Sequence, residues 1–142
     1  MRFSRLSKER LSTCHSDLQI LFNRVVEDND CAIICGHRGE EDQNDAYKNG
    51  ASTLQFPDSK HNTVPSLAVD VAPYETSGID WGKTQSAFFA GVVLGTANEL
   101  FKQGIMKHKI RLGLDWDMDN DIDDTKFWDA CHFEIVPNER DV

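Results

Sequence analysis

The apolar residues of this chain gather into short runs of strand length, with helical patterns of varied length between them. The runs cover residues 31–35, 67–71, 110–114 and 132–136. A short apolar run that is rich in β-branched side chains is typical of a buried strand. Because the helical stretches do not alternate regularly with these runs, we expect an α+β fold.

The helical patterns have recognisable start signals. Ser7 can cap a first short helix, and Ser16 or Asp17 can cap a second helix whose apolar residues form one stripe. The strand that begins at Leu67 is expected to end at Pro73, because proline cannot donate to a strand ladder. We expect helices at residues 7–11, 18–26, 40–48 and 84–102, and a loop at residues 52–64.

Length and composition favour one globular domain over residues 1–142. Hydrophobic residues make up 39% of the 142 residues, and no repeat or low-complexity stretch occurs. The longest apolar run, residues 87–97, is interrupted by Gly91 and Gly95 and is shorter than the roughly 20 residues that a membrane-spanning helix needs. The N-terminal segment has no apolar stretch behind its positive charges. We therefore expect neither an export signal nor membrane insertion.

Charge and cysteine content narrow the functional classes. The formal net charge is −9 and no basic stripe occurs, which argues against direct binding of nucleic acid. The four cysteines form no CxxC pair, so we expect free thiols in a reducing compartment. Cys31 and Cys35 lie in an apolar run and are expected to be buried.

Two imidazoles and two carboxylates carry the strongest chemical signal. His61 lies in the predicted loop, Asp70 in the strand that follows it, and His132 at the start of the last predicted strand. Two histidines, one acidic residue and an open fourth position form a standard hydrolytic zinc site. Asp129, three residues before His132, is placed to act as a general base and later to protonate a leaving amine. Since a single histidine is more often an ordinary polar residue, spacing alone leaves both interpretations open.

The same residues lie in two segments that resemble the M15 metallopeptidases. The segments are Ser59-Lys60-His61 with Ala68-Val69-Asp70, and Trp128-Asp129-Ala130-Cys131-His132-Phe133-Glu134. The family pattern is SxHxxGxAxD followed by DxxH, and it occurs in VanY-type D-alanyl-D-alanine carboxypeptidases and phage L-alanyl-D-glutamate endopeptidases. The resemblance implies that His61, Asp70 and His132 bind one zinc ion per chain and that Asp129 is the catalytic acid and base.

The resemblance covers roughly residues 5–137 and implies a Hedgehog/D-Ala-D-Ala peptidase-like fold, a small, mostly antiparallel sheet with packed helices. One departure occurs in the loop between the first two proposed ligands. Eight residues separate His61 from Asp70, and Pro65-Ser66 stand where the family has glycine. We expect this change to alter the path of the loop rather than the ligands.

Gly36-His37-Arg38, together with Gln43, resembles the family segment that approaches the site. The resemblance implies that Arg38 binds substrate or stabilises the oxyanion. Gln43, Ser59 and His37 are further candidates for substrate binding. A surface role for His37 remains equally open, and Ser59 is expected to orient His61 or its loop because no base is paired with it.

The implied function is cleavage of the peptide stem of bacterial peptidoglycan by a zinc peptidase, with a phage endolysin as the favoured interpretation. The alternatives are a D,D- or L,D-carboxypeptidase and a non-catalytic wall-binding or virion module. The expected partner is the stem peptide and the expected state is a monomer. We expect the protein to be made in the host cytoplasm and to act on the wall after release.

Other residues have weaker signals. The stretch from Asp115 to Asp124 has the DxDxD pattern of a calcium loop, but it lacks the glycine at position six and the glutamate at position twelve. A solvated acidic loop is the default interpretation, with Ca²⁺ binding as the alternative. His15 and His108 are expected to be solvated. Alternation along the last strand predicts that Cys131 points away from His132 into the core.

Overall fold

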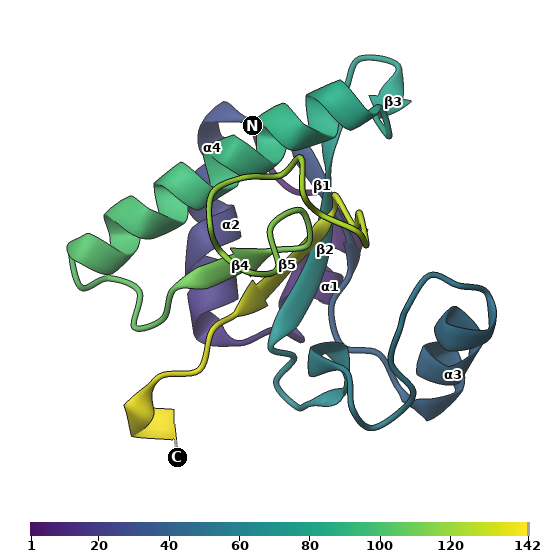
Figure 1. The fold of residues 1–142 in the computed structure, drawn as a ribbon. Helices are drawn as coiled ribbons and strands as arrows, with labels where there is room; N and C mark the ends of the chain where they lie inside the picture. The colour runs from purple at the N-terminus through teal and green to yellow at the C-terminus, as the bar shows by residue number, and fades with distance from the viewer. Residues whose placement is uncertain (142) are drawn as a thin grey trace.

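An antiparallel sheet forms the centre of the computed structural model, which describes residues 1–141 (Figure 1). The strand order is β1-β2-β5-β4, and the short strand β3 pairs with β2. The strands are β1 (Cys31–Cys35), β2 (Ala68–Glu75), β3 (Gly78–Ile79), β4 (Ile110–Leu112) and β5 (His132–Ile135). The helices are α1 (Arg5–Leu11), α2 (Ser16–Asp28), α3 (Glu40–Lys48) and α4 (Lys83–Lys102), with 3₁₀ turns η1 (Lys60–Asn62) and η2 (Glu139–Asp141). The predicted α+β class with a small antiparallel sheet is confirmed.

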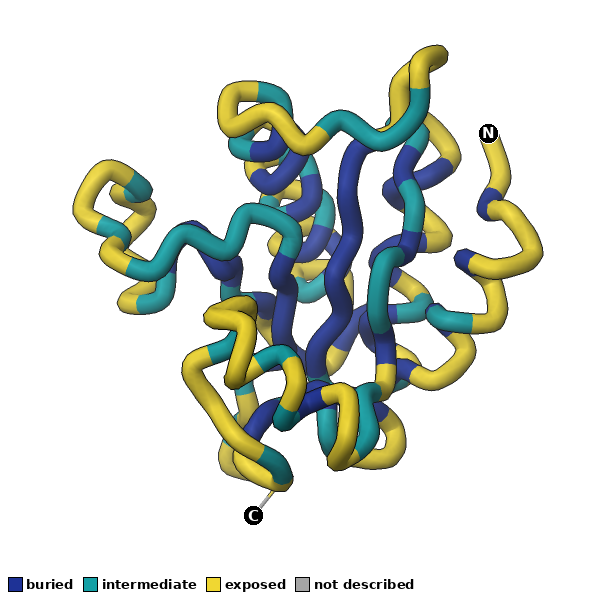
Figure 2. Tube along the Cα trace, turned by 90° about the vertical axis from the view of Figure 1, so that its right-hand side faces the viewer, coloured by how far each residue is buried: buried dark blue, intermediate teal, exposed yellow. Residues whose placement is uncertain are grey.

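Helices α2 and α4 cover one face of the sheet, and Phe133 of β5 lies at the centre of this layer. Its ring packs edge-on against Phe22 of α2 at 5.3 Å and Phe89 of α4 at 6.2 Å between centroids. Figure 2 shows the central strands buried over most of their length. Because side chains alternate across a strand, the neighbours of Phe133 must point away from α2 and α4. The same alternation turns Asp70 of β2 away from the core that Val69 and Val71 enter.

The opposite face of the sheet is covered by loops. Figure 1 shows the connection between β4 and β5, in yellow-green, crossing in front of the sheet while α2 lies behind it. Helix α3 lies apart from the sheet, at the lower right of Figure 1. The polar residues that alternation turns away from the core therefore point into a space bordered by loops.

Strand β1 and helix α3 have the predicted bounds, while other elements begin or end elsewhere. Helix α1 begins at Arg5, because the Ser4 hydroxyl, rather than that of Ser7, accepts the capping hydrogen bond. Ser7 is buried instead, and its hydroxyl accepts a hydrogen bond from Ile33 N. Strand β2 continues through Pro73 to Glu75, since the Pro73 carbonyl accepts a hydrogen bond from Asp80 N at 2.9 Å. Only the donor is missing at proline, so the ladder can continue on its acceptor side.

All four cysteines are free thiols. Cys14 and Cys31 are buried, whereas Cys35 and Cys131 are half-buried, so the expected burial holds for Cys31 and not for Cys35. Cys35 lies at the end of β1, just after a register irregularity in the pairing of β1 with β2. Among the described residues, no helix combines the length and apolar character needed to cross a bilayer.

Candidate metal centre

Asp70 and His132 face each other across the β2–β5 ladder, where they form a register pair. His61 comes to the same place from η1, whose N-cap Ser59 accepts a hydrogen bond from His61 N. His61 Nε2 and His132 Nδ1 each lie 3.3 Å from Asp70 Oδ1. Two ligands of a tetrahedral zinc ion, with bonds of about 2.0–2.1 Å, stand about 3.3 Å apart. Each imidazole nitrogen therefore stands at the distance from Asp70 Oδ1 that separates two ligands of one ion. His61 also groups with Asp70 and Cys35, and His132 with Asp70 and Asp129, with their ligand atoms within 4.8 Å of one another.

Two atoms of this group are buried without a hydrogen-bond partner among the described residues, His61 Nε2 and Asp70 Oδ1. Buried polar atoms without a partner are costly and rare in folded proteins. The outer nitrogen of each ring, by contrast, is satisfied. His61 Nδ1 donates to Gly36 O at 2.7 Å, and His132 Nε2 donates to Glu134 Oε1 at 2.9 Å. These bonds leave a lone pair on each ring nitrogen that faces Asp70, which suits metal coordination.

Asp70 is a strong anion between the two imidazoles. Burial raises its pKa, but the adjacent imidazoles of His132 and His61, each 3.3 Å from Oδ1, outweigh burial and hold the pKa well below its usual range. Burial lowers the pKa of His61, whereas the neighbouring Asp70 carboxylate and Cys35 thiol raise it to about 10. A divalent cation at this point would replace the protons that the cluster otherwise attracts.

Asp129 lies in the turn that leads into β5 and points toward the same group. One ligand atom from each of Asp70, Asp129 and His132 lies within 4.8 Å of the others. Burial, followed by the charge of Asp70, raises the pKa of Asp129 above the usual carboxyl value. A raised pKa helps a carboxyl group both to accept and to donate a proton near neutral pH, although a bound cation would act in the opposite direction.

The Asp129 turn is held by a close approach at Gly113. Gly113 N donates to His132 O at 2.8 Å, and Asp129 N donates to Gly113 O at 3.0 Å. A Cβ on residue 113 would lie 2.2 Å from Asp129 O and 2.8 Å from His132 Cβ. Only glycine lets the backbone after β4 come this near to the turn, so Gly113 sets the position of both functional residues.

The side chains of the candidate metal centre line a pocket of about 580 Å³, together with Asp129. Residues 51–54 and 58–61 form one wall, and Trp116, Phe127 and Asp129 form the other. The ring of Trp116 packs on His132 with 5.3 Å between centroids, and its Nε1 donates to Phe127 O. The pocket thus joins the candidate metal centre to open space that can admit an extended chain.

Residues 1–136 match the sequence family described as phage L-alanyl-D-glutamate peptidase. The chain belongs to this family. It is 30% identical over 142 residues to the L-alanyl-D-glutamate peptidase of Escherichia phage T5, across 95% of this chain and 98% of that protein. The solved structure of the L-Ala D-Glu endopeptidase ChiX of Serratia marcescens superposes with a TM-score of 0.71, covering 96% of this chain and 90% of ChiX at 22% identity. The likeness to ChiX supports the fold.

Glu134 belongs to the site, although the sequence patterns gave it no role. Its Oε1 accepts from His132 Nε2, and its Oε2 accepts from Lys60 at 2.9 Å and from Arg111 at 3.0 Å. Burial raises the pKa of Glu134, but hydrogen bonds from His132 and Lys60 lower it to about 2. The signal was available, because Glu134 lies two residues after His132 on one strand and must share its face.

Arg38 lines the pocket and contacts Asp70 directly. Its Nη2 lies 3.3 Å from Asp70 Oδ2, and its Nη1 donates to Gln43 Oε1 at 3.1 Å. Gln43 is fully buried and does not line the pocket. It also donates to Ser52 Oγ and Leu54 O, so its contact with the site runs through Arg38 and the pocket wall. In this conformation Gln43 positions other residues and does not face a substrate.

The remaining candidates divide between the pocket and the surface. Ser59 lines the pocket and caps η1, which agrees with the expectation that it orients His61. His37 is exposed, lies outside the pocket lining, and donates its backbone N–H to Thr13 Oγ1. The prediction that Cys131 enters the core is wrong. Cys131 lies just before β5, where strand alternation has not begun; it lines the pocket and its Sγ lies 3.6 Å from Asp129 Oδ1.

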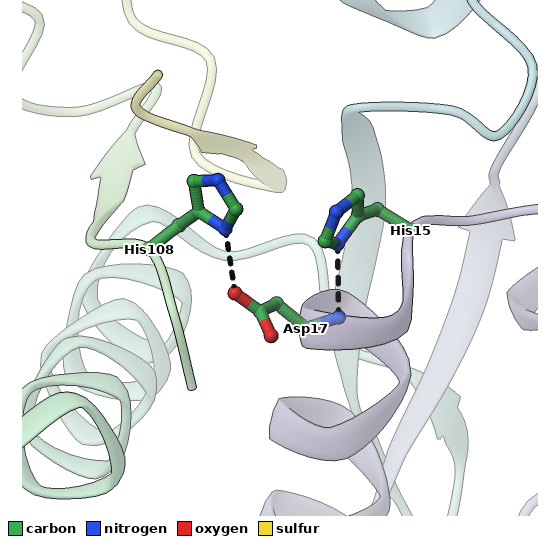
Figure 3. Close-up of side chains that lie close together, drawn as sticks. All are labelled: His15, Asp17 and His108. Carbon is green, nitrogen blue, oxygen red and sulfur yellow. Dashed lines mark hydrogen bonds and ion pairs between the residues drawn. The ribbon is translucent and has the colours of Figure 1, made fainter. Parts of the chain in front are cut away.

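A second group of histidine and aspartate side chains lies at the start of α2 (Figure 3). His108 Nδ1 donates to Asp17 Oδ2 at 2.8 Å, and His108 Nε2 lies 2.9 Å from Asp141 Oδ2. His15 caps α2 by accepting from Asp17 N. The prediction that His108 is solvated is therefore wrong, since the chain after α4 folds back onto α2 and buries this ring to 7% exposure.

The acidic stretch forms a loop with its own internal hydrogen bonds. Asp115 is buried, and its carboxylate accepts from Asp119 N and Asn120 N. Asp117 and Asp119 are exposed, and one oxygen from each of these three carboxylates lies within 4.8 Å of the others. Such turns satisfy acidic side chains in the absence of an ion as well. Binding of Ca²⁺ here stays a prediction, which a Ca²⁺ titration followed by Trp116 fluorescence can test.

Proposed function

We propose that this chain is a zinc-dependent peptidase of M15 type that cleaves the bond between L-alanine and D-glutamate in the peptide stem of peptidoglycan. The observation that carries the proposal is the pair of partnerless buried atoms, His61 Nε2 and Asp70 Oδ1, beside His132 Nδ1. The substrate is proposed from the family and from the peptidase of phage T5, whose names specify this bond.

The residues of the pocket have distinct parts in the proposed reaction. His61, Asp70 and His132 would hold the ion, which supplies Lewis acidity and lowers the pKa of bound water to about 7. Asp129 takes the proton from the attacking water and delivers it to the leaving amine nitrogen. Arg38 contacts Asp70 and presents a cation to the pocket, where it can stabilise the oxyanion of the tetrahedral intermediate.

Metal content and product analysis together test the proposal. The protein purified without chelator should contain about one zinc per chain, and His61→Ala should lose it while keeping its fold. Digestion of purified peptidoglycan should release peptides with a new D-glutamate amino terminus, identified by mass spectrometry. Released D-alanine would instead identify a carboxypeptidase. A folded protein with neither zinc nor products would identify a non-catalytic wall-binding or virion module.

We further propose that the protein acts as a phage endolysin, made in the host cytoplasm and reaching the wall after the membrane is breached. The support is its membership in a phage family. Expression in a bacterial host should leave cells intact until the membrane is permeabilised, and lysis should then be rapid. Cells that lyse just as fast without permeabilisation would contradict this mode of action, and an Asp129→Ala strain serves as the control.

A further inference from the structure

Two cations share a single carboxylate on the wall of the pocket. Lys60 Nζ lies 2.9 Å and Arg111 Nη2 lies 3.0 Å from Glu134 Oε2, and Arg111 Nε lies 3.1 Å from the same oxygen. All three residues line the pocket. Lys60 comes from η1, Arg111 from β4 and Glu134 from β5, so three separate elements bring these groups together.

The charges of this group do not balance. Two positive side chains face one negative side chain, and Glu134 also accepts a hydrogen bond from His132. The Lys60 and Arg111 side chains are 26% and 29% exposed, whereas Glu134 is 8% exposed. Within the described residues, Arg111 Nη1 has no hydrogen-bond partner, because both of its bonds to Glu134 use Nε and Nη2. The three side chains therefore carry one net positive charge. Lys60 Nζ also donates to Ile135 O at 2.7 Å, whereas one guanidinium nitrogen of Arg111 is available to a ligand.

Arg38 is the third cation that lines the pocket, and more of its guanidinium group is already bound to protein atoms. Its side chain is 16% exposed, and its two terminal nitrogens contact Asp70 and Gln43. An anionic ligand would have to compete with Asp70 for it. The Lys60–Arg111 pair is the stronger candidate for binding an anion from solution.

The carboxylate of Glu134 connects the Lys60–Arg111 pair to the candidate metal centre. Glu134 contacts the pair through Oε2 and His132 through Oε1, and His132 Nδ1 faces Asp70. A ligand group at the pair thus lies in the same pocket as the candidate metal centre.

We propose that Lys60 and Arg111 form a carboxylate subsite that binds the free carboxylate of the D-glutamate residue on the leaving side of the scissile amide. This inference rests on the proposed function. D-glutamate has two carboxylates, and whichever one continues the peptide, the other remains free close to the cleaved bond. A guanidinium with an unused nitrogen next to an ammonium group is well suited to recognise it.

A pair of substrates that differ only in charge tests the subsite. One is an N-acyl-L-alanyl-D-glutamyl peptide, and the other has the free carboxylate of D-glutamate replaced by its primary amide. We expect wild-type kcat/KM to be about 10–100-fold higher for the acid, the factor expected for a charge-assisted hydrogen bond. Arg111→Met should lower kcat/KM for the acid by most of this factor and change the value for the amide little.

The controls separate recognition from support of the metal centre. A role of Arg111 only through Glu134 and His132 would lower kcat/KM for both substrates alike, and that result would overturn the proposal. Arg111→Lys retains the charge and should keep part of the preference for the acid. Lys60→Met provides an independent variant if Arg111→Met does not fold. Lys109→Met removes an exposed charge outside this pocket and should leave the preference unchanged.

A binding measurement that needs no turnover tests the subsite independently of the proposed function. Calorimetric titration with the D-glutamyl product amine and with its amide should show tighter binding of the acid to wild type, and equal binding of the two to Arg111→Met. If neither substrate is cleaved, the proposed function fails, while this titration still decides the subsite. Equal affinity of wild type for acid and amide would contradict it.

Discussion

Gly113 lies directly against the backbone of Asp129, so that a Cβ at residue 113 would come within 2.2 Å of the Asp129 carbonyl oxygen. The contact links the end of β4 to the turn that carries the proposed acid and base. It also lies beside His132, whose carbonyl accepts from Gly113 N. The geometry of the candidate site therefore depends on the absence of one side chain.

Gly113→Ala should displace the Asp129 turn. We expect a loss of about 1–3 kcal/mol in the free energy of unfolding, typical of overpacking, with a larger fractional loss of kcat. Denaturant unfolding and peptidoglycan turnover measure the two effects. Gly91→Ala is the matched control, because nothing lies within 4 Å of its Cβ position in α4. That control should gain about 0.5–1 kcal/mol from helix propensity and keep full activity.

Asp129→Asn should separate chemistry from metal binding. The amide keeps the size of the side chain and cannot accept the proton, so kcat should fall by about 10²–10⁴. Zinc content and thermal stability should stay close to wild type, since Asp129 is proposed to hold a proton and not the ion. Loss of zinc together with activity would show instead that Asp129 is a ligand.

Glu134→Gln should weaken the orientation of His132. The amide oxygen of the variant can still accept a hydrogen bond from Nε2 but lacks the charge, and loss of such a partner typically costs about 10–100-fold in metal affinity or activity. Competition with a chromophoric zinc chelator measures the affinity. Glu139→Gln, an exposed residue of η2, serves as the matched control. Unchanged zinc affinity in Glu134→Gln would leave Glu134 with a role in substrate binding alone.

His108 should make stability depend on pH. Burial lowers its pKa, but hydrogen bonds to Asp141 and Asp17 outweigh burial, so the pKa lies above the ordinary value. A raised folded-state pKa contributes stability that is complete below about pH 6.5 and is lost as pH rises through the folded-state value. The pKa of Asp141 is lowered by Asn138 N–H and by His108, so its contribution is lost only in acid.

The groups that face His108 are Asp17, Asp141 and the His15 ring. The stability advantage of wild type over His108→Gln should therefore be largest between about pH 4 and 6.5 and should shrink at alkaline pH. Chemical unfolding at constant zinc concentration over pH 4–9 gives this difference. His37→Gln, at an exposed site outside the cluster, should run parallel to wild type. A difference for His108→Gln that grows with pH would have the wrong sign.

Much of the fold could be predicted because local patterns and tertiary packing agree. The apolar run of β1 and the helix-prone residues of α3 ended where the pattern indicated. Asp70 and His132 lie on two of the predicted strands, and in the structure these two residues form a register pair. Errors occurred where a long-range contact competed with a local signal, as at Ser7, which binds Ile33 instead of capping a helix.

The sequence by itself indicated which side chains could form a metal site, because two histidines and one acidic residue are a standard ligand set of hydrolytic zinc. It could not show that His61 Nε2 and His132 Nδ1 converge on one oxygen of Asp70, since that depends on the path of the loop to η1. Nor could it show that Glu134 accepts a hydrogen bond from His132 and forms ion pairs with Lys60 and Arg111. These contacts join residues far apart in the chain, and only the packing of β4, β5 and η1 into one structure brings their charges together.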